Sequence, residues 1–411
     1  MIPVSLEALD ESLVSRDFME DPYPILHRLR ADDPVHWSDS IGGWVLTRYD
    51  DIVTTFKDVT HYSSEGRLAK ATEYLPPELR GKLKAFEDYY HQKSLIHSDP
   101  PDHTRLRSLV TKAFTPRVVE AMRPRMRAIV DELLDAVRED GKMDVIKGLA
   151  IPLPVTVLAE IFGVPHSDVG LFKNWADGVL ASQGVNKPAV ELLERSQTAL
   201  LEIRAYLTEL IKEKRRQPCP DLLSELVAAE SEGDRLSPAE LVQSCITLLV
   251  AGHETTTSLL GNGIYTLLRH PDQWRMLQDD PALLNSAIEE ILRYESPVAR
   301  QPRLMKQDAE MGGRPLRQGE VVFQMLNAAN RDPAYFGDPD RFDIKREKNR
   351  HIAFGLGNHF CVGATLARTE AQVVFSTVIE RLPALRLVDN EPEWDLQKPN
   401  SRMLKTLPVR F

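Results

Sequence analysis

The sequence predicts a mainly α-helical fold with a minor sheet, formed by a single domain over residues 1–411. Apolar residues recur with the spacing of an amphipathic helix in four segments, at residues 117–139, 152–163, 188–215 and 220–230. Residues 238–269 would form a helix of about 48 Å, which is long enough to cross a whole domain. No internal repeat, low-complexity tract or linker marks a domain boundary, so one domain accounts for the whole chain.

Two short stretches predict the minor sheet. Residues 35–37 and 43–47 are expected to form the two strands of a hairpin around residues 40–42, because apolar and aromatic positions flank a glycine-containing turn. Residues 316–325 are expected to form another small strand pair. Both stretches are short, which keeps the sheet a minor part of the fold.

The long helix has a clear start and a clear end. Ser237 is placed to cap it, Pro238 suits its first position, and Glu240 completes a capping box. His270 and Pro271 should end it, since the residue before a proline is biased away from helical geometry. The sequence therefore fixes both ends of this element.

Composition excludes several classes of function. Hydrophobic residues make up 42% of the chain and charged residues 27%, as in a globular protein, and the net charge of −10 gives nucleic-acid binding no electrostatic support. Three cysteines (Cys219, Cys245 and Cys361) give no disulfide framework and fit a reducing cytosol. We find neither the apolar core of a signal peptide nor a membrane span. We therefore expect a cytoplasmic protein with no membrane partner.

The centre of the long helix carries residues that weaken a helix. Residues 251–257 read Ala-Gly-His-Glu-Thr-Thr-Thr, between apolar flanks that imply burial. Glycine costs about 1 kcal/mol in a helix interior, and β-branched threonines add to that cost. A small residue at Ala251 or Gly252 would leave room for a flat ligand, while Glu254 and Thr255 pair an acid with an alcohol that can relay protons.

A single cysteine lies in a glycine-containing loop directly before a predicted helix. Cys361 follows glycines at 355 and 357, which allow a tight backbone, and a helical pattern begins directly after it. A thiol at a helix N-terminus ionises easily and becomes a strong metal ligand. A lone thiolate in such a loop is what an axial ligand of haem iron requires. Structural zinc is disfavoured, because His359 and Cys361 are a poor ligand pair and we find no second pair.

The run from Phe354 to Gly363 resembles the haem-ligand loop of the cytochrome P450 family, FGxGxHxCxG, at every fixed position. The resemblance implies the family's triangular α-helical prism with a small β-rich lobe. It also implies haem b (iron protoporphyrin IX) as cofactor, with Cys361 as the metal ligand. Phe354, His359 and Gly363 would then belong to the cofactor site, as would Ala251 and Gly252.

Residues 251–255 are similar to the family's [AG]GxxT motif. By this resemblance Glu254 would feed protons and Thr255 would hydrogen-bond the oxygen being activated, so both would be catalytic. The segment with His103 and Arg107 resembles the family's HxxxR helix, whose two residues contact the haem propionates. Arg303 occupies the place of a further propionate arginine, with Arg300 as its competitor, and His359 completes the set.

Two further elements resemble structural parts of the family. Glu290 and Arg293 match its ExxR element, and Arg341 matches the third member of its Glu-Arg-Arg triad. Residues 330–333 match the meander before the cysteine loop. Arg105 is expected to face outward. Together these motifs lie in family order over nearly the whole chain.

The implied activity is that of a bacterial-type, soluble, monomeric monooxygenase that inserts one atom of O2 into a C–H bond or an alkene. Its partners would be a small, mostly apolar substrate, O2, a ferredoxin and an NAD(P)H-dependent ferredoxin reductase, which would dock near arginines 107, 117 and 368. The substrate class rests on apolar and aromatic residues in the segments that set specificity, at positions 74, 89, 90, 172, 175, 298 and 299.

Two alternatives remain. A peroxide-driven relative of the same fold would dispense with the acid–alcohol pair, so Glu254 and Thr255 favour O2. A non-enzymatic haem protein, such as a gas sensor or carrier, would need an attached output module, whereas one domain accounts for all 411 residues.

Overall fold

The computed structural model describes residues 5–66, 72–183, 185, 187–229, 236–388 and 392–411. The chain divides into two compact units. Unit 1 contains residues 1–62, 123–151 and 255–411, and unit 2 contains residues 63–122 and 152–254. Helices dominate both, which confirms the mainly α-helical prediction.

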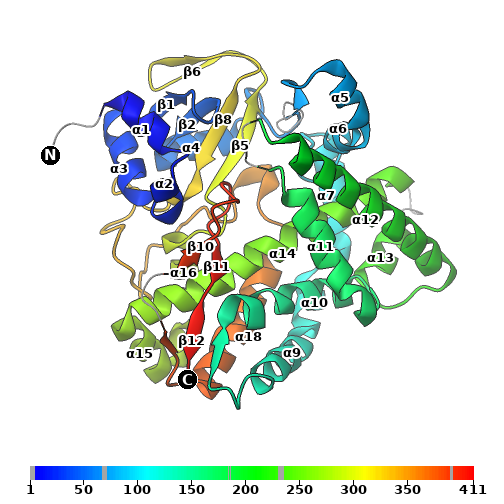
Figure 1. The fold of residues 1–411 in the computed structure, drawn as a ribbon, viewed down its shortest axis with the longest axis vertical. Coiled ribbons are helices and arrows are strands. Elements are labelled where there is room, and N and C mark those ends of the chain that lie inside the picture. Colours follow the sequence, from blue (N-terminus) through cyan, green and yellow to red (C-terminus); the bar gives the residue numbers. More distant parts are fainter. Residues whose placement is uncertain (1–4, 67–71, 184, 186, 230–235, 389–391) are drawn as a thin grey trace. The chain divides into compact units, whose positions relative to one another are not determined.

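Unit 1 holds the sheets and the helices around them (Figure 1). Its helices are α1 (Leu6–Ser12), α2 (Arg16–Glu20), α3 (Tyr23–Asp32), α4 (Tyr49–Lys57), α9 (Arg123–Asp135), α15 (Pro271–Asp279), α16 (Leu284–Tyr294), α17 (Leu326–Ala329) and α18 (Ala364–Arg381). Shorter helical turns are η2 (Ile146–Ala150), η4 (Pro281–Leu283) and η5 (Gly357–His359). The polar side chain of Asp280 accepts the N–H of Ala282 and caps the turn that leads into α16.

A five-stranded sheet has the order β1-β2-β8-β5-β3. Its strands are β1 (Val35–Ser38), β2 (Gly43–Leu46), β3 (Tyr62–Ser63), β5 (Arg300–Met305) and β8 (Val321–Met325). β1 and β2 form the predicted antiparallel hairpin, with Val35 opposite Leu46. β8 is parallel to β2 and antiparallel to β5, and the four longer strands lie side by side in Figure 1.

The predicted strand pair at 316–325 is wrong in its pairing. Residues 314–316 form β7, which pairs with β6 (Ala309–Met311) in a separate two-stranded sheet. Residues 321–325 form β8 and join the large sheet instead. The turn between them does close, since Glu320 N–H donates to Arg317 O at 3.1 Å, but each strand takes its partner from elsewhere in the chain.

The sheet of unit 1 packs on α4 through an apolar cluster. Trp44 and Leu46 of β2, Val322 of β8 and Met305 of β5 are buried together with Ile52 and Phe56 of α4. Burying side chains of this size contributes roughly 1.5–3 kcal/mol each. The remaining strands form two small sheets, β4-β12-β9 (Lys142–Asp144, Pro408–Arg410, Arg386–Leu387) and β10-β11 (Glu393–Trp394, Leu404–Thr406).

Unit 2 consists mainly of helices. They are α5 (Pro77–Lys82), α6 (Lys84–His91), α7 (Asp102–Ala113), α8 (Pro116–Ala121), α10 (Pro152–Ile161), η3 (His166–Asp168), α11 (Val169–Leu180), α12 (Val190–Arg216) and α13 (Leu222–Ala229). The four predicted helical segments are confirmed, with 117–139 divided between α8 and α9. Phe172 and Trp175 of α11 pack on Tyr206 of α12 with ring centroids 5.2 and 5.3 Å from it. These rings stabilise helix packing within unit 2.

Helix α14 (Pro238–Arg269) runs without interruption from unit 2 into unit 1. Its predicted cap is confirmed: Ser237 N–H donates to Glu240 Oε2 at 2.8 Å, and Glu240 N–H donates to Ser237 Oγ at 3.2 Å. The helix ends one residue before His270, as expected.

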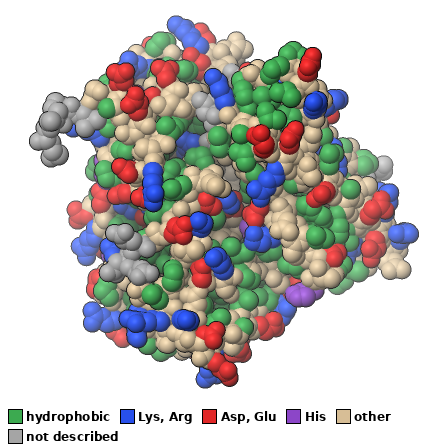
Figure 2. Space-filling view, viewed as in Figure 1, with side chains coloured by type: hydrophobic (Ala, Val, Ile, Leu, Met, Phe, Trp, Pro, Cys, Tyr) green, Lys and Arg blue, Asp and Glu red, His purple; other side chains and the backbone are tan. Residues whose placement is uncertain are grey.

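Within the described part of the chain, no helix combines the length and the apolar character needed to cross a membrane. Acidic and basic side chains are interspersed on the face of the molecule shown in Figure 2.

Candidate functional site

The cysteine loop folds tightly around its thiol. Gly355 and Gly357 have φ angles of 68° and 66°, which side chains other than hydrogen rarely tolerate. A Cβ on Gly357 would lie 2.9 Å from the backbone oxygen of Phe56, so both the angle and the space require glycine. The backbone N–H of Cys361 donates to the carbonyl of Phe354 at 2.9 Å and closes the loop.

Cys361 lies directly before α18, as the sequence predicts. Gly363 occupies the N-cap position of that helix, and a Cβ there would meet Cys361 Sγ at an ordinary contact distance of 3.9 Å. The thiol is half-buried and not in a disulfide. The unpaired N–H groups of a helix N-terminus favour a thiolate at this position.

Phe56 of α4 links the cysteine loop to Arg303 of β5. The ring of Phe56 lies against Gly355, and its carbonyl lies against Gly357. The guanidinium of Arg303 lies 5.4 Å from the centroid of the same ring and is 4% exposed. Sequence reasoning missed Phe56, because its apolar spacing is that of any core residue of a helix.

Arg300, the competitor of Arg303, points elsewhere. Its Nε donates to Asn400 Oδ1 at 3.0 Å, and its guanidinium lies 5.2 Å from the ring centroid of Phe323. Burial lowers the pKa of Arg300 to about 10. The structure thus brings Arg303, and not Arg300, to the phenylalanine that supports the cysteine loop.

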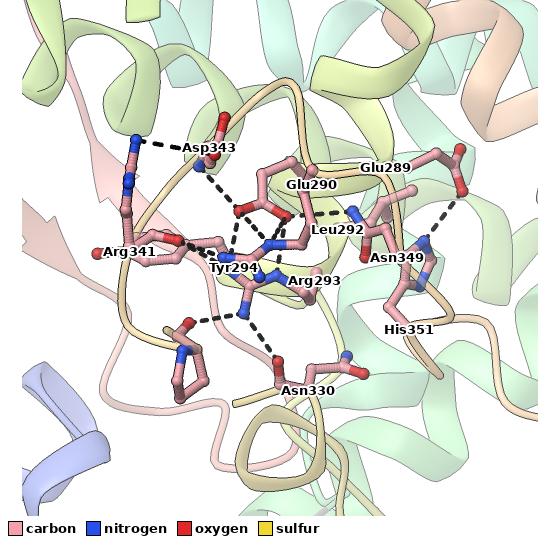
Figure 3. Close-up of polar contacts among 12 residues, drawn as sticks. Glu289, Glu290, Leu292, Arg293, Tyr294, Asn330, Arg341, Asp343, Asn349 and His351 are labelled. Atoms are coloured by element: carbon pink, nitrogen blue, oxygen red, sulfur yellow. Dashed lines mark hydrogen bonds and ion pairs between the residues drawn. The ribbon is translucent and has the colours of Figure 1, made fainter. Parts of the chain in front are cut away.

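The predicted ExxR pair, Glu290 and Arg293, forms a fully buried, bidentate ion pair (Figure 3). Arg293 Nε and Nη2 each donate to the Glu290 carboxylate at 2.8 Å. Arg293 Nη1 also donates to the carbonyls of Asn330 and Pro339, at 3.0 and 2.6 Å. Because these carbonyls belong to the segment before the cysteine loop, the pair fixes that segment to α16.

The prediction that Arg341 completes this triad is wrong. The side chain of Arg341 is 66% exposed, and its guanidinium lies 3.8 Å from Asp343. Arg346 takes the place instead: its Nε lies 3.2 and 3.1 Å from the two carboxylate oxygens of Glu290. A turn in which Arg346 N–H donates to Asp343 O carries Arg346 back to Glu290. Arg341 contributes only its carbonyl, which accepts hydrogen bonds from both Arg293 and Arg346.

The α14 motif places an acid and an alcohol side by side in sequence at the boundary between the units. Glu254 is 6% exposed and Thr255 is half-buried. Thr257 Oγ1 donates to the carbonyl of Ala150 at 3.0 Å, which gives one threonine of the motif a structural role. Gly252 faces α10, since a Cβ there would lie 2.9 Å from Leu158 Cδ1, whereas Ala251 is exposed.

The predicted propionate contacts of unit 2 lie on α7. His103 is 1% exposed and Arg107 is half-buried, four residues apart on one face of the helix. Arg105 lies partly exposed off that face, with Asp102 at 3.9 Å, and its guanidinium also donates to Glu240 of the α14 cap. Phe354, His359, Cys361, Gly363 and Arg303 thus gather in unit 1, and His103, Arg107, Ala251, Gly252 and Glu254 belong to unit 2.

The other two cysteines have no such setting. Cys245 is fully buried on α14, and burial raises the pKa of its thiol to about 12, as expected for a small core residue. Cys219 is exposed. Among the residues that the structure describes, no three His, Cys, Asp or Glu side chains gather into a metal-binding group.

The residues present fit a haem held by one thiolate. The glycines of the loop leave no room for a side chain next to Phe56. The N-terminus of the following helix favours an anionic sulfur. A buried arginine suited to binding a carboxylate, Arg303, lies beside the ring of Phe56. Among the described residues, Cys361 belongs to no group of three or more His, Cys, Asp or Glu side chains, so its single sulfur matches haem and not structural zinc.

Comparisons with known proteins agree with a haem-binding protein of the cytochrome P450 type. The family model for Cytochrome P450 matches residues 183–410. The chain is 42% identical to Cytochrome P450 107B1 of Saccharopolyspora erythraea, over 96% of each chain. It is 41% identical to Cytochrome P450 monooxygenase PikC of Streptomyces venezuelae, over 98% of this chain and 94% of PikC.

A solved structure shows the same fold. The crystal structure of P450BioI in complex with an acyl carrier protein ligated to hexadec-9Z-enoic acid has a TM-score of 0.88 and 37% identity, covering 97% of this chain and all of that one (100%). The predicted fold class and enzyme class are thereby confirmed. The chain belongs to the cytochrome P450 family of bacterial haem-thiolate monooxygenases.

Proposed function

We propose that the protein binds haem b through Cys361 and uses O2, with electrons from separate proteins, to hydroxylate a C–H bond or epoxidise an alkene. The observation that carries this proposal is the geometry of the cysteine loop, which closes through the bond from Cys361 N–H to Phe354 O and begins α18. The haem, when bound, supplies the iron at which O2 is reduced and its oxygen atom is transferred.

The protein's own residues hold the cofactor and its charges. Arg303, His103, Arg107 and His359 would neutralise the two propionates, and arginine suits this task because its planar fork donates two parallel hydrogen bonds. Arg303 and His103 are 4% and 1% exposed, which supports the proposal, since a propionate carried into the interior needs buried donors to balance its charge. Ala251 and Gly252 remain candidates for haem contact, and the exposure of Ala251 makes it the stronger of the two.

Glu254 and Thr255 would move protons. The carboxyl group of Glu254 would pass protons inward, and the hydroxyl of Thr255, the adjacent residue in the sequence, would donate them to the oxygen being activated. This pair is why we propose O2, and not peroxide, as the oxidant.

The substrate would be a small and mostly apolar molecule. The neighbouring structure of P450BioI carries a hexadecenoic acid on its carrier protein, an apolar chain of this kind. Among the residues that the sequence assigns to specificity, Tyr89 and Tyr90 are buried with ring centroids 4.9 Å apart, and Val298 is half-buried. A role in secondary metabolism accords with the relative named Polyketide biosynthesis cytochrome P450 PksS, of Bacillus subtilis.

A ferredoxin and its NAD(P)H-dependent reductase would supply the electrons. Of the arginines expected at the docking face, Arg368 is occupied by a two-pronged bond to Glu289 at 2.6 and 2.7 Å, whereas Arg117 is exposed. Arg117→Glu is therefore the cleaner probe, and it should slow reduction by ferredoxin without changing the haem spectrum.

We further propose that the two compact units are the halves of one monomeric haem domain. The continuous helix α14, which belongs to both, supports this. Three free cysteines support a cytoplasmic location.

The decisive experiment is spectroscopic. The reduced protein treated with carbon monoxide should show the long-wavelength absorption of a thiolate-ligated haem, and Cys361→Ser should lose it. Turnover with ferredoxin, reductase and O2 should exceed turnover with peroxide. If peroxide alone sustains turnover, the proposal that O2 is the oxidant is wrong. If the spectrum of Cys361→Ser is unchanged, the proposal that Cys361 is the iron ligand is wrong.

A further inference from the structure

The carboxylate of Glu289 joins three parts of unit 1 that converge on the cysteine loop. Glu289 lies on α16, directly before Glu290 of the ExxR pair. Its two oxygens accept hydrogen bonds from Arg368 Nε and Nη2 at 2.6 and 2.7 Å. The second oxygen also lies 3.0 Å from His351 Nε2, a contact drawn in Figure 3. Arg368 belongs to α18 and His351 to the segment entering the loop, so one carboxylate ties both to α16.

The bond between Glu289 and His351 has a defined direction. His351 Nδ1 accepts the backbone N–H of Ala353 at 3.2 Å, which leaves Nε2 as the ring nitrogen that donates to Glu289. Burial raises the pKa of Glu289, but the hydrogen bonds from Arg368 and His351 outweigh it and bring the pKa to about 2. Glu289 is therefore an anion at neutral pH.

Arg368 reaches the cysteine through Phe354. The guanidinium of Arg368 lies 4.5 Å from the ring centroid of Phe354, within the range of a cation–π contact. The carbonyl of Phe354 accepts the N–H of Cys361 at 2.9 Å. His351 also lies beside this ring, with centroids 6.2 Å apart. Both groups that Glu289 holds thus contact the residue that closes the loop around the thiol.

We propose that Glu289 is a positioning residue for the iron-ligating thiolate, an inference that rests on the proposed role of Cys361. Glu289 fixes Arg368 over Phe354, and so keeps the carbonyl of Phe354 in place for Cys361. It also balances the charge of Arg368 in a region where an extra cation would stabilise the reduced, more negative iron site. Loss of the carboxylate should therefore loosen the thiolate and raise the reduction potential.

The test compares the haem-loaded parent with Glu289→Gln and with a matched control, Glu380→Gln. Glu380 is on the same helix as Arg368 and forms an ion pair with Arg127 at 2.9 Å, with its side chain 62% exposed, so the control loses the same charge away from the loop. The two readouts are the rate at which the reduced carbon monoxide complex loses its thiolate band on warming, and the midpoint potential of the haem.

We expect Glu289→Gln to lose the thiolate band about fivefold faster than the parent, and to have a higher midpoint potential. Glu380→Gln should match the parent in both. A merely structural role would not move the potential. Equal rates and equal potentials in parent and Glu289→Gln would overturn the proposal.

Arg368→Lys separates the two effects, and it carries the test if Glu289→Gln does not fold. Lysine keeps the charge but cannot make two parallel bonds to Glu289 while lying flat over Phe354. We expect faster loss of the band with an unchanged potential, and an unchanged rate would overturn the positioning role. Absence of the thiolate band from the parent itself would instead overturn the proposed role of Cys361.

Discussion

The buried carboxyl group of Glu370 should make the folded protein less stable as the pH rises. This residue lies on α18 and is 1% exposed, and its two carboxylate oxygens have no hydrogen-bond partner among the residues that the structure describes. Burial without a partner raises the pKa of Glu370 from 4.5 to about 8. Between these values the folded protein keeps the proton while the unfolded chain has lost it. The free energy of unfolding therefore falls with rising pH across this window.

The magnitude follows from the width of that window. Each pH unit is worth roughly 1.4 kcal/mol, so the whole interval corresponds to at most about 5 kcal/mol. Glu370→Gln has nearly the same shape and no proton to lose. We expect its stability advantage over the parent to be small near pH 5, to grow with each unit, and to level off above about pH 8.

Urea unfolding of parent and variant at a series of pH values measures this difference. Glu380→Gln is the matched control, because Glu380 is on the same helix but exposed, with a pKa lowered by Arg127. Its stability relative to the parent should be nearly flat over the same range. A difference between Glu370→Gln and the parent that does not change from about pH 5 to pH 8 would refute the reasoning.

Three further predictions follow from the site. Arg346→Ala should destabilise the protein by about 3 kcal/mol, because it removes a partner of the buried Glu290. Arg341 is exposed, so Arg341→Ala should cost less than about 0.5 kcal/mol, and chemical unfolding of the two variants measures the difference. Gly357→Ala should cost about 2 kcal/mol and reduce haem retention, measured by absorbance after dialysis, since its φ is 66° and a Cβ would meet the carbonyl of Phe56. Glu254→Gln should lower O2-dependent turnover by about a hundredfold and leave the carbon monoxide spectrum intact; unchanged product formation would remove Glu254 from the proton path.

Features that depend on neighbours in the chain could be predicted from the sequence. The cap of α14 at Ser237 and Glu240 and the hairpin of β1 and β2 were predicted with the right residues. The start of α18 directly after Cys361 belongs to the same class. In each case the interacting groups lie within about ten residues of each other in the sequence, so their spacing alone determines which groups come into contact.

Partners distant in sequence were decided by the tertiary structure. Arg341 and Arg346 are both basic residues near the ExxR pair, and only the turn at Asp343 decides that Arg346 reaches Glu290. Likewise, Arg303 is joined to the cysteine loop by Phe56, which comes from a helix about 250 residues earlier and whose apolar spacing gives no sign of it.

The sequence by itself was enough to predict haem-thiolate chemistry for this protein. The features that predict it, the glycines of the loop and the start of a helix, lie within a few residues of Cys361. The tertiary structure decided which charges hold that loop. Glu289 is one of two adjacent glutamates on α16, and only the packing of α16 beside α18 brings it to Arg368 and His351. On α18, Glu370 has no hydrogen-bond partner among the residues that the structure describes, because charge pairing depends on distances that sequence spacing does not contain.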